Sequence, residues 1–189
     1  MKRITSYQPQ NISFTHGEGH WLWDTDGKKY FDALCGIAVT SLGHNHPKIT
    51  KAIQEQAAKL LHTSNLFQIT EQNVLAERLT TLSGMDQVFF GNSGAEANET
   101  AIKIARLFGH SKGIETPSII VMGKAFHGRT MATLTASAGR KGQAGFEPLV
   151  PGFVRAPYND IDAINAIAEN RSDIVAIMIE PIQGEGGVN

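Results

Sequence analysis

The residues with the clearest chemical potential lie in one short stretch that combines glycine, serine and carboxylate side chains. The stretch 91–103 is GNSGAEANETAIK, which is typical of a tight turn that leads directly into a helix. The first amides of a helix have no acceptor within it, so they can bind a phosphate, and the Ser93 hydroxyl can add a hydrogen bond. If phosphate binds here, the protein is an enzyme that uses a nucleotide or a phosphorylated cofactor.

The same turn also has a purely structural interpretation. Ser93 and Glu96 have the spacing of a capping box, in which serine caps the helix and glutamate reaches back. Both interpretations can hold together, because a cap uses only some of the free amides. Gly91 and Gly94 favour anion binding, since a large anion needs close approach of the backbone. A serine hydrolase is disfavoured because G-x-S-x-G would require glycine at Ala95.

A second useful stretch, AFHGRT at 125–130, follows an all-apolar segment at 118–122 that we expect to be a strand. Phe126 offers an aromatic face that can stack on a flat ring. Arg129 offers a guanidinium that can bind a carboxylate through two parallel hydrogen bonds. Core packing of Phe126 and a surface position for Arg129 are the alternatives, and neither residue alone outweighs its alternative. Their position beyond a strand end strengthens the functional interpretation of both.

Other candidate residues are a carboxylate and two lysines. Glu185 lies between glycines in the loop 183–187, which favours a carboxylate held for recognition. Lys103 lies one helical turn after Glu99, so an ion pair between them is the favoured interpretation. Lys124 follows the expected strand, where a Schiff-base lysine is conceivable, but a solvated loop lysine is favoured.

Composition narrows the class of protein. The 189 residues carry a formal net charge of -1, which gives no electrostatic reason to expect nucleic acid or an anionic membrane as partner. Cys35 is the single cysteine, so no internal disulfide is possible. His44 and His46 lack a cluster of other ligand types, and a metal site is disfavoured. No secretory signal or bilayer-spanning run is recognisable, so we expect a cytoplasmic protein.

The elements that must position these residues alternate between strands and helices. Near the start we expect a hairpin of strands 21–23 and 29–31 with Asp26-Gly27 at its turn. Helices are expected over 47–61, 70–82, 95–108 and 160–169, the second with a buried stripe of Val74, Leu75, Leu79 and Leu82. Strands are expected over 87–90, 118–122, 153–156 and 173–179. This alternation indicates an open α/β sheet whose ligands bind at the carboxyl ends of strands.

Three motifs that occur in the order NSGAEANETAIKIAR, AFHGRT and IEPIQGEGG resemble the class III aminotransferases of fold type I. The segment 12–49 resembles the N-terminal segment of that family, so the resemblance covers essentially the whole chain. Within the family the motifs are most similar to those of acetylornithine aminotransferases, which act in arginine biosynthesis. The resemblance implies a fold-type-I α/β architecture. Residues 1–57 would be an N-terminal part of the small domain, and 58–189 the first half of the large, mainly parallel-sheet domain.

The resemblance also implies roles for individual residues. Ser93, Gly94 and Ala95 match the segment that holds the phosphate of pyridoxal 5′-phosphate (PLP), and Phe126 matches the aromatic residue stacked on its ring. Arg129 matches the arginine that binds the substrate α-carboxylate, and Glu185 matches a glutamate near the substrate end of the pocket. The implied reaction transfers an amino group from N-acetylornithine to 2-oxoglutarate. Ornithine, succinyl-diaminopimelate and 4-aminobutyrate remain alternative substrates, and a homodimer is the implied assembly.

One part of the family pattern is not found in this sequence. The Schiff-base lysine and the aspartate that pairs with the pyridine nitrogen follow the IEPIQGEGG segment in the family, so we expect them beyond residue 189. None of the lysines at 103, 112, 124 and 141 lies in the lysine motif of the family. We therefore expect the chain alone to be inactive and to belong to a longer enzyme. The alternative is a non-catalytic truncated protein that binds PLP or phosphate.

Overall fold

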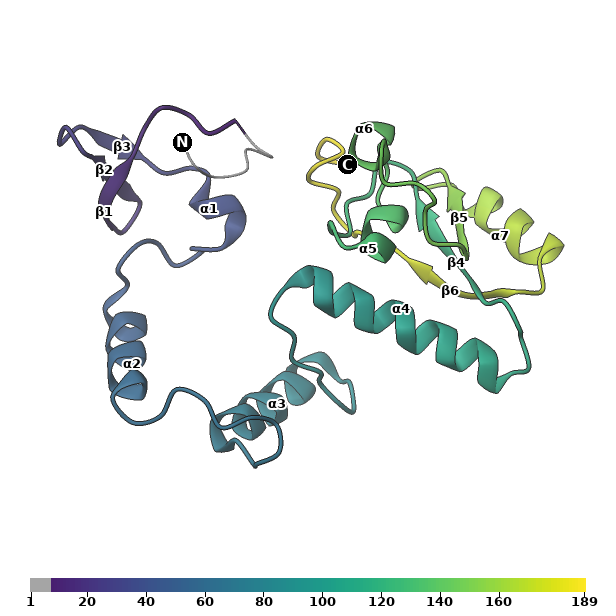
Figure 1. Cartoon of the computed structure of the whole chain (residues 1–189), viewed down its shortest axis with the longest axis horizontal. Coiled ribbons are helices and arrows are strands. Elements are labelled where there is room, and N and C mark those ends of the chain that lie inside the picture. The colour runs from purple at the N-terminus through teal and green to yellow at the C-terminus, as the bar shows by residue number, and fades with distance from the viewer. Residues whose placement is uncertain (1–7) are drawn as a thin grey trace. The chain divides into compact units, whose positions relative to one another are not determined.

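The computed structural model describes residues 8–189 (Figure 1). The chain forms two compact units, Met1–Leu75 and Ala76–Asn189, and the division between them falls within helix α3 (Thr70–Ser83). The assignment of residues 1–57 and 58–189 to a small and a large domain stays a prediction. No helix in the described part of the chain is long and apolar enough to cross a membrane.

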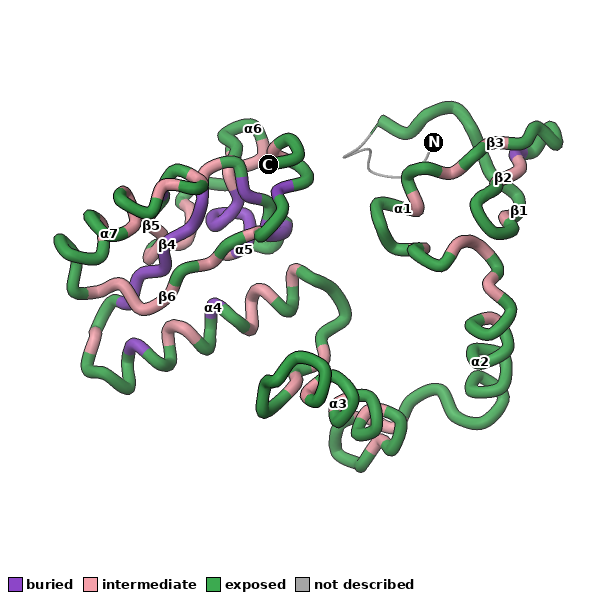
Figure 2. The backbone as a smooth tube through the Cα atoms, turned by 180° about the vertical axis from the view of Figure 1, so that it is seen from behind, coloured by how far each residue is buried: buried purple, intermediate pink, exposed green. Residues whose placement is uncertain are grey.

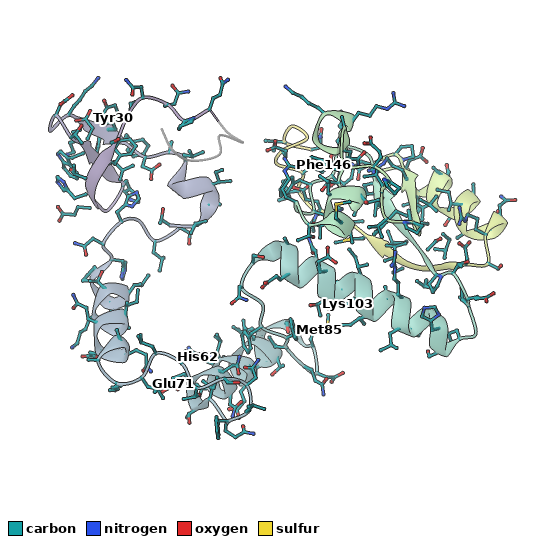
Figure 3. The ribbon with its side chains drawn as sticks, viewed as in Figure 1. Tyr30, His62, Glu71, Met85, Lys103 and Phe146 are labelled. Carbon is teal, nitrogen blue, oxygen red and sulfur yellow. The ribbon has the colours of Figure 1, made fainter. Side chains whose placement is uncertain are left out.

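The first unit begins with a three-stranded antiparallel sheet. Its strands, in spatial order, are β1 (Phe14–Glu18), β2 (Trp21–Asp24) and β3 (Lys29–Phe31). The predicted hairpin is confirmed, and Gly27 in its turn has a φ of +78°, which favours glycine. The Asp24 carboxylate stabilises the turn by accepting hydrogen bonds from the amides of Asp26 and Lys28 at 2.9 and 2.8 Å. It also accepts one from the hydroxyl of Tyr30, labelled in Figure 3.

Three helices follow this sheet along the chain. Helix α1 (Cys35–Ala38) is a short left-handed turn in which all four residues have positive φ, and no sequence pattern predicted it. Helix α2 (Pro47–Ala57) begins with Pro47 as predicted but ends before the predicted residue 61. Helix α3 occupies almost the predicted range.

The predicted buried stripe on α3 is wrong. Val74, Leu75, Leu79 and Leu82 are 53%, 48%, 37% and 84% exposed. Figure 2 shows that most of α2 and α3 is exposed. The spacing of apolar residues correctly indicates a helix with an apolar face, but nothing in the described residues buries that face.

The second unit is built on a parallel sheet with the strand order β5–β4–β6. The strands are β4 (Ser118–Met122), β5 (Phe153–Ala156) and β6 (Ile174–Met178). The central strand β4 is buried along its whole length, as the apolar run that follows Ser118 predicts for a strand covered on both faces (Figure 2). This arrangement confirms the predicted α/β class.

Helices cover both faces of this sheet, and the side chains of β4 alternate between them. Ile119 and Val121 pack with Ile102 of helix α4 (Gly94–Ser111). Ile120 and Met122 lie in a second cluster, against which helix α7 (Ile161–Asn170) packs with Ile164 and Ile167. Two short helices, α5 (Met131–Ala136) and α6 (Arg140–Gln143), follow the carboxyl end of β4.

One predicted strand is absent. Residues 87–90 form no strand, and Phe89 is 66% exposed. A short apolar run forms a strand only where a neighbouring strand supplies the hydrogen-bond partners, and the described sheets offer none to this segment. The remaining predicted elements of this unit agree with the structure to within a few residues.

Candidate active site

The turn before α4 has the serine half of the predicted capping box, whereas the glutamate bonds a different amide from the one predicted. Ser93 has extended backbone angles, and its hydroxyl accepts a hydrogen bond from the Glu96 amide at 3.2 Å. The Glu96 carboxylate reaches back to the amide of Asn92, one residue before the cap. At Gly94 the position that a Cβ would occupy has no other atom within 4 Å, so the backbone there is open to a ligand. The cap leaves the first helical amides of α4 without acceptors inside the helix.

The loop between β4 and α5 lies directly beside this turn. The side-chain amide of Asn98 on α4 donates a hydrogen bond to the carbonyl of His127 at 2.8 Å. Gly128 has a φ of +141°, and a Cβ built on it would lie 3.0 Å from the Cβ of Ala95. The structure therefore brings together the two stretches, 91–95 and 125–130, that the sequence singled out separately.

Phe126 and Arg129 form a pair on the surface of this loop. The guanidinium carbon of Arg129 lies 4.9 Å from the centroid of the Phe126 ring, within the range of a cation–π interaction. Phe126 is 38% exposed, so its ring is not a core residue. Arg129 is also exposed. An aromatic face and a guanidinium are thus held next to each other at the carboxyl end of the sheet.

A third segment, the loop after β6, joins the other two. The carboxylate of Glu180 accepts hydrogen bonds from the Phe126 amide at 3.0 Å and from the Gly184 amide at 3.1 Å. The fully buried side chain of Gln183 donates to the carbonyl of Gly123 at 2.8 Å. Glu185 is exposed on this same loop. The structure therefore places Glu185 on a loop that is bonded to the Phe126 loop.

Sequence reasoning assigned no role to Glu180, Gln183 or Asn98. Each of them connects a side chain to a backbone group at least 29 residues away. Only the polar character of Glu180 and Gln183 beyond an apolar strand could have drawn attention to them. Their partners depend on which strand ends become neighbours in the sheet, and local sequence does not specify this.

The surroundings of the lysines and histidines agree only in part with those predicted from the sequence. Lys124 is exposed, in agreement with the favoured interpretation of a solvated loop lysine. The predicted ion pair between Glu99 and Lys103 is wrong, because Glu99 instead accepts a hydrogen bond from Thr130. Lys103 is exposed on α4 (Figure 3). In the first unit, the Nε2 atom of His44 lies 2.6 Å from a carboxylate oxygen of Asp32.

Burial lowers the pKa of His127, which is only 4% exposed. The nearby Glu180 carboxylate opposes this shift, and the Arg155 guanidinium adds to it. The Nε2 atom has no hydrogen-bond partner among the described residues. His127 is therefore neutral at neutral pH in the folded protein.

We expect the stability of the protein to fall as the pH drops below about 6.5, the pKa of histidine in an unfolded chain. Below that pH the unfolded state takes up a proton at His127 that the folded state binds only at lower pH, so the folded state loses stability. The loss stays below about 1.4 kcal/mol per pH unit, the maximum for one proton. Urea unfolding at pH 7.5 and 5.5 measures it. A His127→Gln variant should lose less stability than the parent between these pH values. Variants of the exposed His110 serve as controls and should behave like the parent. Equal losses in all three proteins would contradict the assignment of the pH dependence to His127.

The family model for class-III aminotransferases matches residues 4–189, so the chain belongs to this family. The acetylornithine aminotransferase of Nitrosomonas europaea is 59% identical over 98% of this chain and 47% of the relative. The corresponding enzyme of Gloeobacter violaceus is 52% identical over 97% of this chain and 46% of the relative. The chain spans about half the length of the curated relatives it matches.

Solved structures agree with this assignment. The ornithine aminotransferase of Toxoplasma gondii ME49 superposes with a TM-score of 0.94 at 32% identity, over 100% of this chain and 45% of that one. The acetylornithine aminotransferase of Elizabethkingia anophelis gives a TM-score of 0.80 at 38% identity, over 99% of this chain and 43% of that one. The chain thus has the fold of part of a fold-type-I aminotransferase, a class of PLP-dependent enzymes.

Proposed function

We propose that this chain forms part of a PLP-dependent aminotransferase that transfers an amino group from N-acetylornithine to 2-oxoglutarate. The names of its relatives support the substrate. The observation that carries the proposal is the convergence of three segments at the carboxyl end of the sheet. The 91–95 turn, the Phe126–Arg129 loop and the Glu185 loop are joined by the hydrogen bonds of Asn98 and Glu180.

The residues of the 91–95 turn fit the phosphate of PLP. The open backbone at Gly94 lets an oxygen approach the first amides of α4, and Ser93 and Ala95 flank it. The exposed ring of Phe126 would stack on the pyridine ring. When bound, PLP supplies the electron sink for the reaction, and the protein supplies binding and orientation.

Arg129 would bind the α-carboxylate of the substrate. Its guanidinium lies over the Phe126 ring, so a carboxylate that it binds would be adjacent to the stacked cofactor. Glu185 would lie toward the far end of the substrate. We place the lysine that carries the cofactor outside residues 1–189, because Lys103, Lys112, Lys124 and Lys141 lie outside the lysine motif of the family. The complete enzyme would be a cytoplasmic homodimer.

Ornithine is the second candidate substrate. The high TM-score with the ornithine aminotransferase of Toxoplasma gondii supports it, and Arg129 would serve an α-carboxylate in either case. Succinyl-diaminopimelate and 4-aminobutyrate are further alternatives.

Substrate profiling of the complete protein loaded with PLP tests the proposal. We expect kcat/KM for N-acetylornithine with 2-oxoglutarate to exceed that for ornithine by at least about tenfold, since a pocket discriminates by groups it contacts. Good turnover of ornithine without turnover of N-acetylornithine would reject the proposed substrate. Absence of turnover with all four amines would favour the non-catalytic alternative.

A further inference from the structure

Glu99 connects the helix of the phosphate-binding turn to the beginning of α5. Its Oε1 atom accepts a hydrogen bond from the Thr130 hydroxyl and a longer one, at 3.4 Å, from the Thr133 amide. The hydroxyls of Thr130 and Thr133 lie 2.7 Å apart, and Thr130 is the N-cap of α5. A carboxylate on α4 thereby holds the residue that directly follows Arg129.

The same turn of α4 also holds the loop before Arg129. Asn98, the neighbour of Glu99, donates its side-chain hydrogen bond to the carbonyl of His127. The loop is therefore linked to α4 through the His127 carbonyl, two residues before Arg129, and through the Thr130 hydroxyl, one residue after it. The Arg129 side chain is itself exposed. These two links therefore fix the position of the backbone from which the side chain extends.

We propose that Glu99 is a positioning residue for carboxylate recognition, which acts through Thr130 to fix the backbone that carries Arg129. This inference rests on the proposed role of Arg129 as the site of the substrate α-carboxylate. Two parallel hydrogen bonds between guanidinium and carboxylate require a defined approach. A small displacement of a binding group costs much of its effect. Glu99 thus contributes to the preference for substrates that have an α-carboxylate.

A purely structural role of Glu99 makes a different prediction. If Glu99 only stabilises the start of α5, its loss lowers stability and impairs all substrates equally. If it positions Arg129, its loss impairs substrates that have the carboxylate and spares those that lack it. The comparison of an amino acid with its decarboxylated amine therefore separates the two roles.

The experiment uses Glu99→Ala and Thr130→Val in the complete PLP-loaded enzyme, with N-acetylornithine and its decarboxylated counterpart N-acetylputrescine as amines. For both variants we expect KM for N-acetylornithine to rise about tenfold with kcat within about twofold, because a charge-assisted link is lost without change to the reacting groups. For N-acetylputrescine, kcat/KM should change less than about twofold. Titration with glutarate, a dicarboxylate that is not turned over, should show a matching rise in Kd.

Three control variants make the result decisive. Thr130→Ser keeps the hydroxyl and should behave like the parent. Thr100→Val removes a hydroxyl whose hydrogen bond, to the Glu96 carbonyl, stays within α4, and it should also behave like the parent. Glu99→Gln keeps an acceptor oxygen and should give a smaller effect of the same kind, which covers the case that Glu99→Ala does not fold.

The outcomes separate failure of the inference from failure of the proposed function. Equal losses with both amines, or lower stability without a change in either KM, overturn the positioning role of Glu99. If Arg129→Lys removes the preference for the carboxylated amine but Thr130→Val does not, only the inference about Glu99 fails. If Arg129→Lys leaves that preference unchanged, the proposed role of Arg129 fails and the inference about Glu99 fails with it.

Discussion

A Gly128→Ala variant should be among the most damaging single changes in the second unit, with a loss of about 2–5 kcal/mol in the free energy of unfolding. The backbone at Gly128 has a φ of +141°, which residues with a side chain rarely adopt. A Cβ there would also lie 2.9 Å from the Cβ of Thr133 and 3.0 Å from that of Ala95, so neighbouring backbone must move. Denaturant unfolding measures the loss.

The same substitution should weaken PLP binding more than about tenfold, since Ala95 belongs to the proposed phosphate-binding turn and a displaced turn presents its amides poorly. Gly139→Ala is the matched control. Gly139 has a similar φ of +129°, but a Cβ there would meet no atom within 4 Å. The Gly139→Ala control should lower the free energy of unfolding only by the strain of a side chain at positive φ, about 1–3 kcal/mol. It should leave the affinity for PLP unchanged. If the two variants weaken PLP binding equally, contact between Gly128 and Ala95 does not determine the site.

The parts of the fold that the sequence predicted are those in which local pattern and final environment agree. The apolar run 118–122 predicts a strand covered on both faces, and β4 lies between helices on both sides of the sheet. Ser93 and Glu96 predict the start of α4 because a cap forms from residues close in sequence. Where the packing partner of a segment is not specified by residues near it in the sequence, the same reasoning fails. The stripe on α3 and the run 87–90 are correctly recognised as apolar, but the described residues provide no surface or strand to pair with them.

The candidate site follows the same division. Ser93, Phe126, Arg129 and Glu185 were predicted as site residues from residue type and position beside strand or helix ends, and their roles stay predictions. The residues that hold their segments together were not predicted, because Asn98, Glu99, Glu180 and Gln183 contact groups 29–60 residues distant in sequence. For Glu99 the local rule for helices even gave the wrong partner. The i,i+4 spacing favours Lys103, but an exposed pair contributes only a few tenths of a kcal/mol. A hydrogen bond to Thr130 at the start of another helix is the interaction that forms.

An Arg129→Lys variant should lower kcat/KM for N-acetylornithine by about 10- to 100-fold while leaving kcat within about threefold. Lysine keeps the charge, so any effect of net charge on substrate approach is retained. It cannot form two parallel hydrogen bonds with a carboxylate, and its ammonium stacks less well on the Phe126 ring. Steady-state kinetics of the complete enzyme with N-acetylornithine and N-acetylputrescine measure the effect.

The comparison of the two amines separates carboxylate binding by Arg129 from a general effect of the substitution on the loop. N-acetylputrescine has no carboxylate for residue 129 to bind, so its kcat/KM should be the same in parent and variant to within about twofold. Arg140→Lys, at an exposed position on the nearby helix α6, makes the same chemical change and should leave both amines unaffected. A loss shared equally by the two amines would instead indicate that Arg129 supports the loop or the stacked ring, since only a direct contact with the α-carboxylate makes the variant sensitive to its presence.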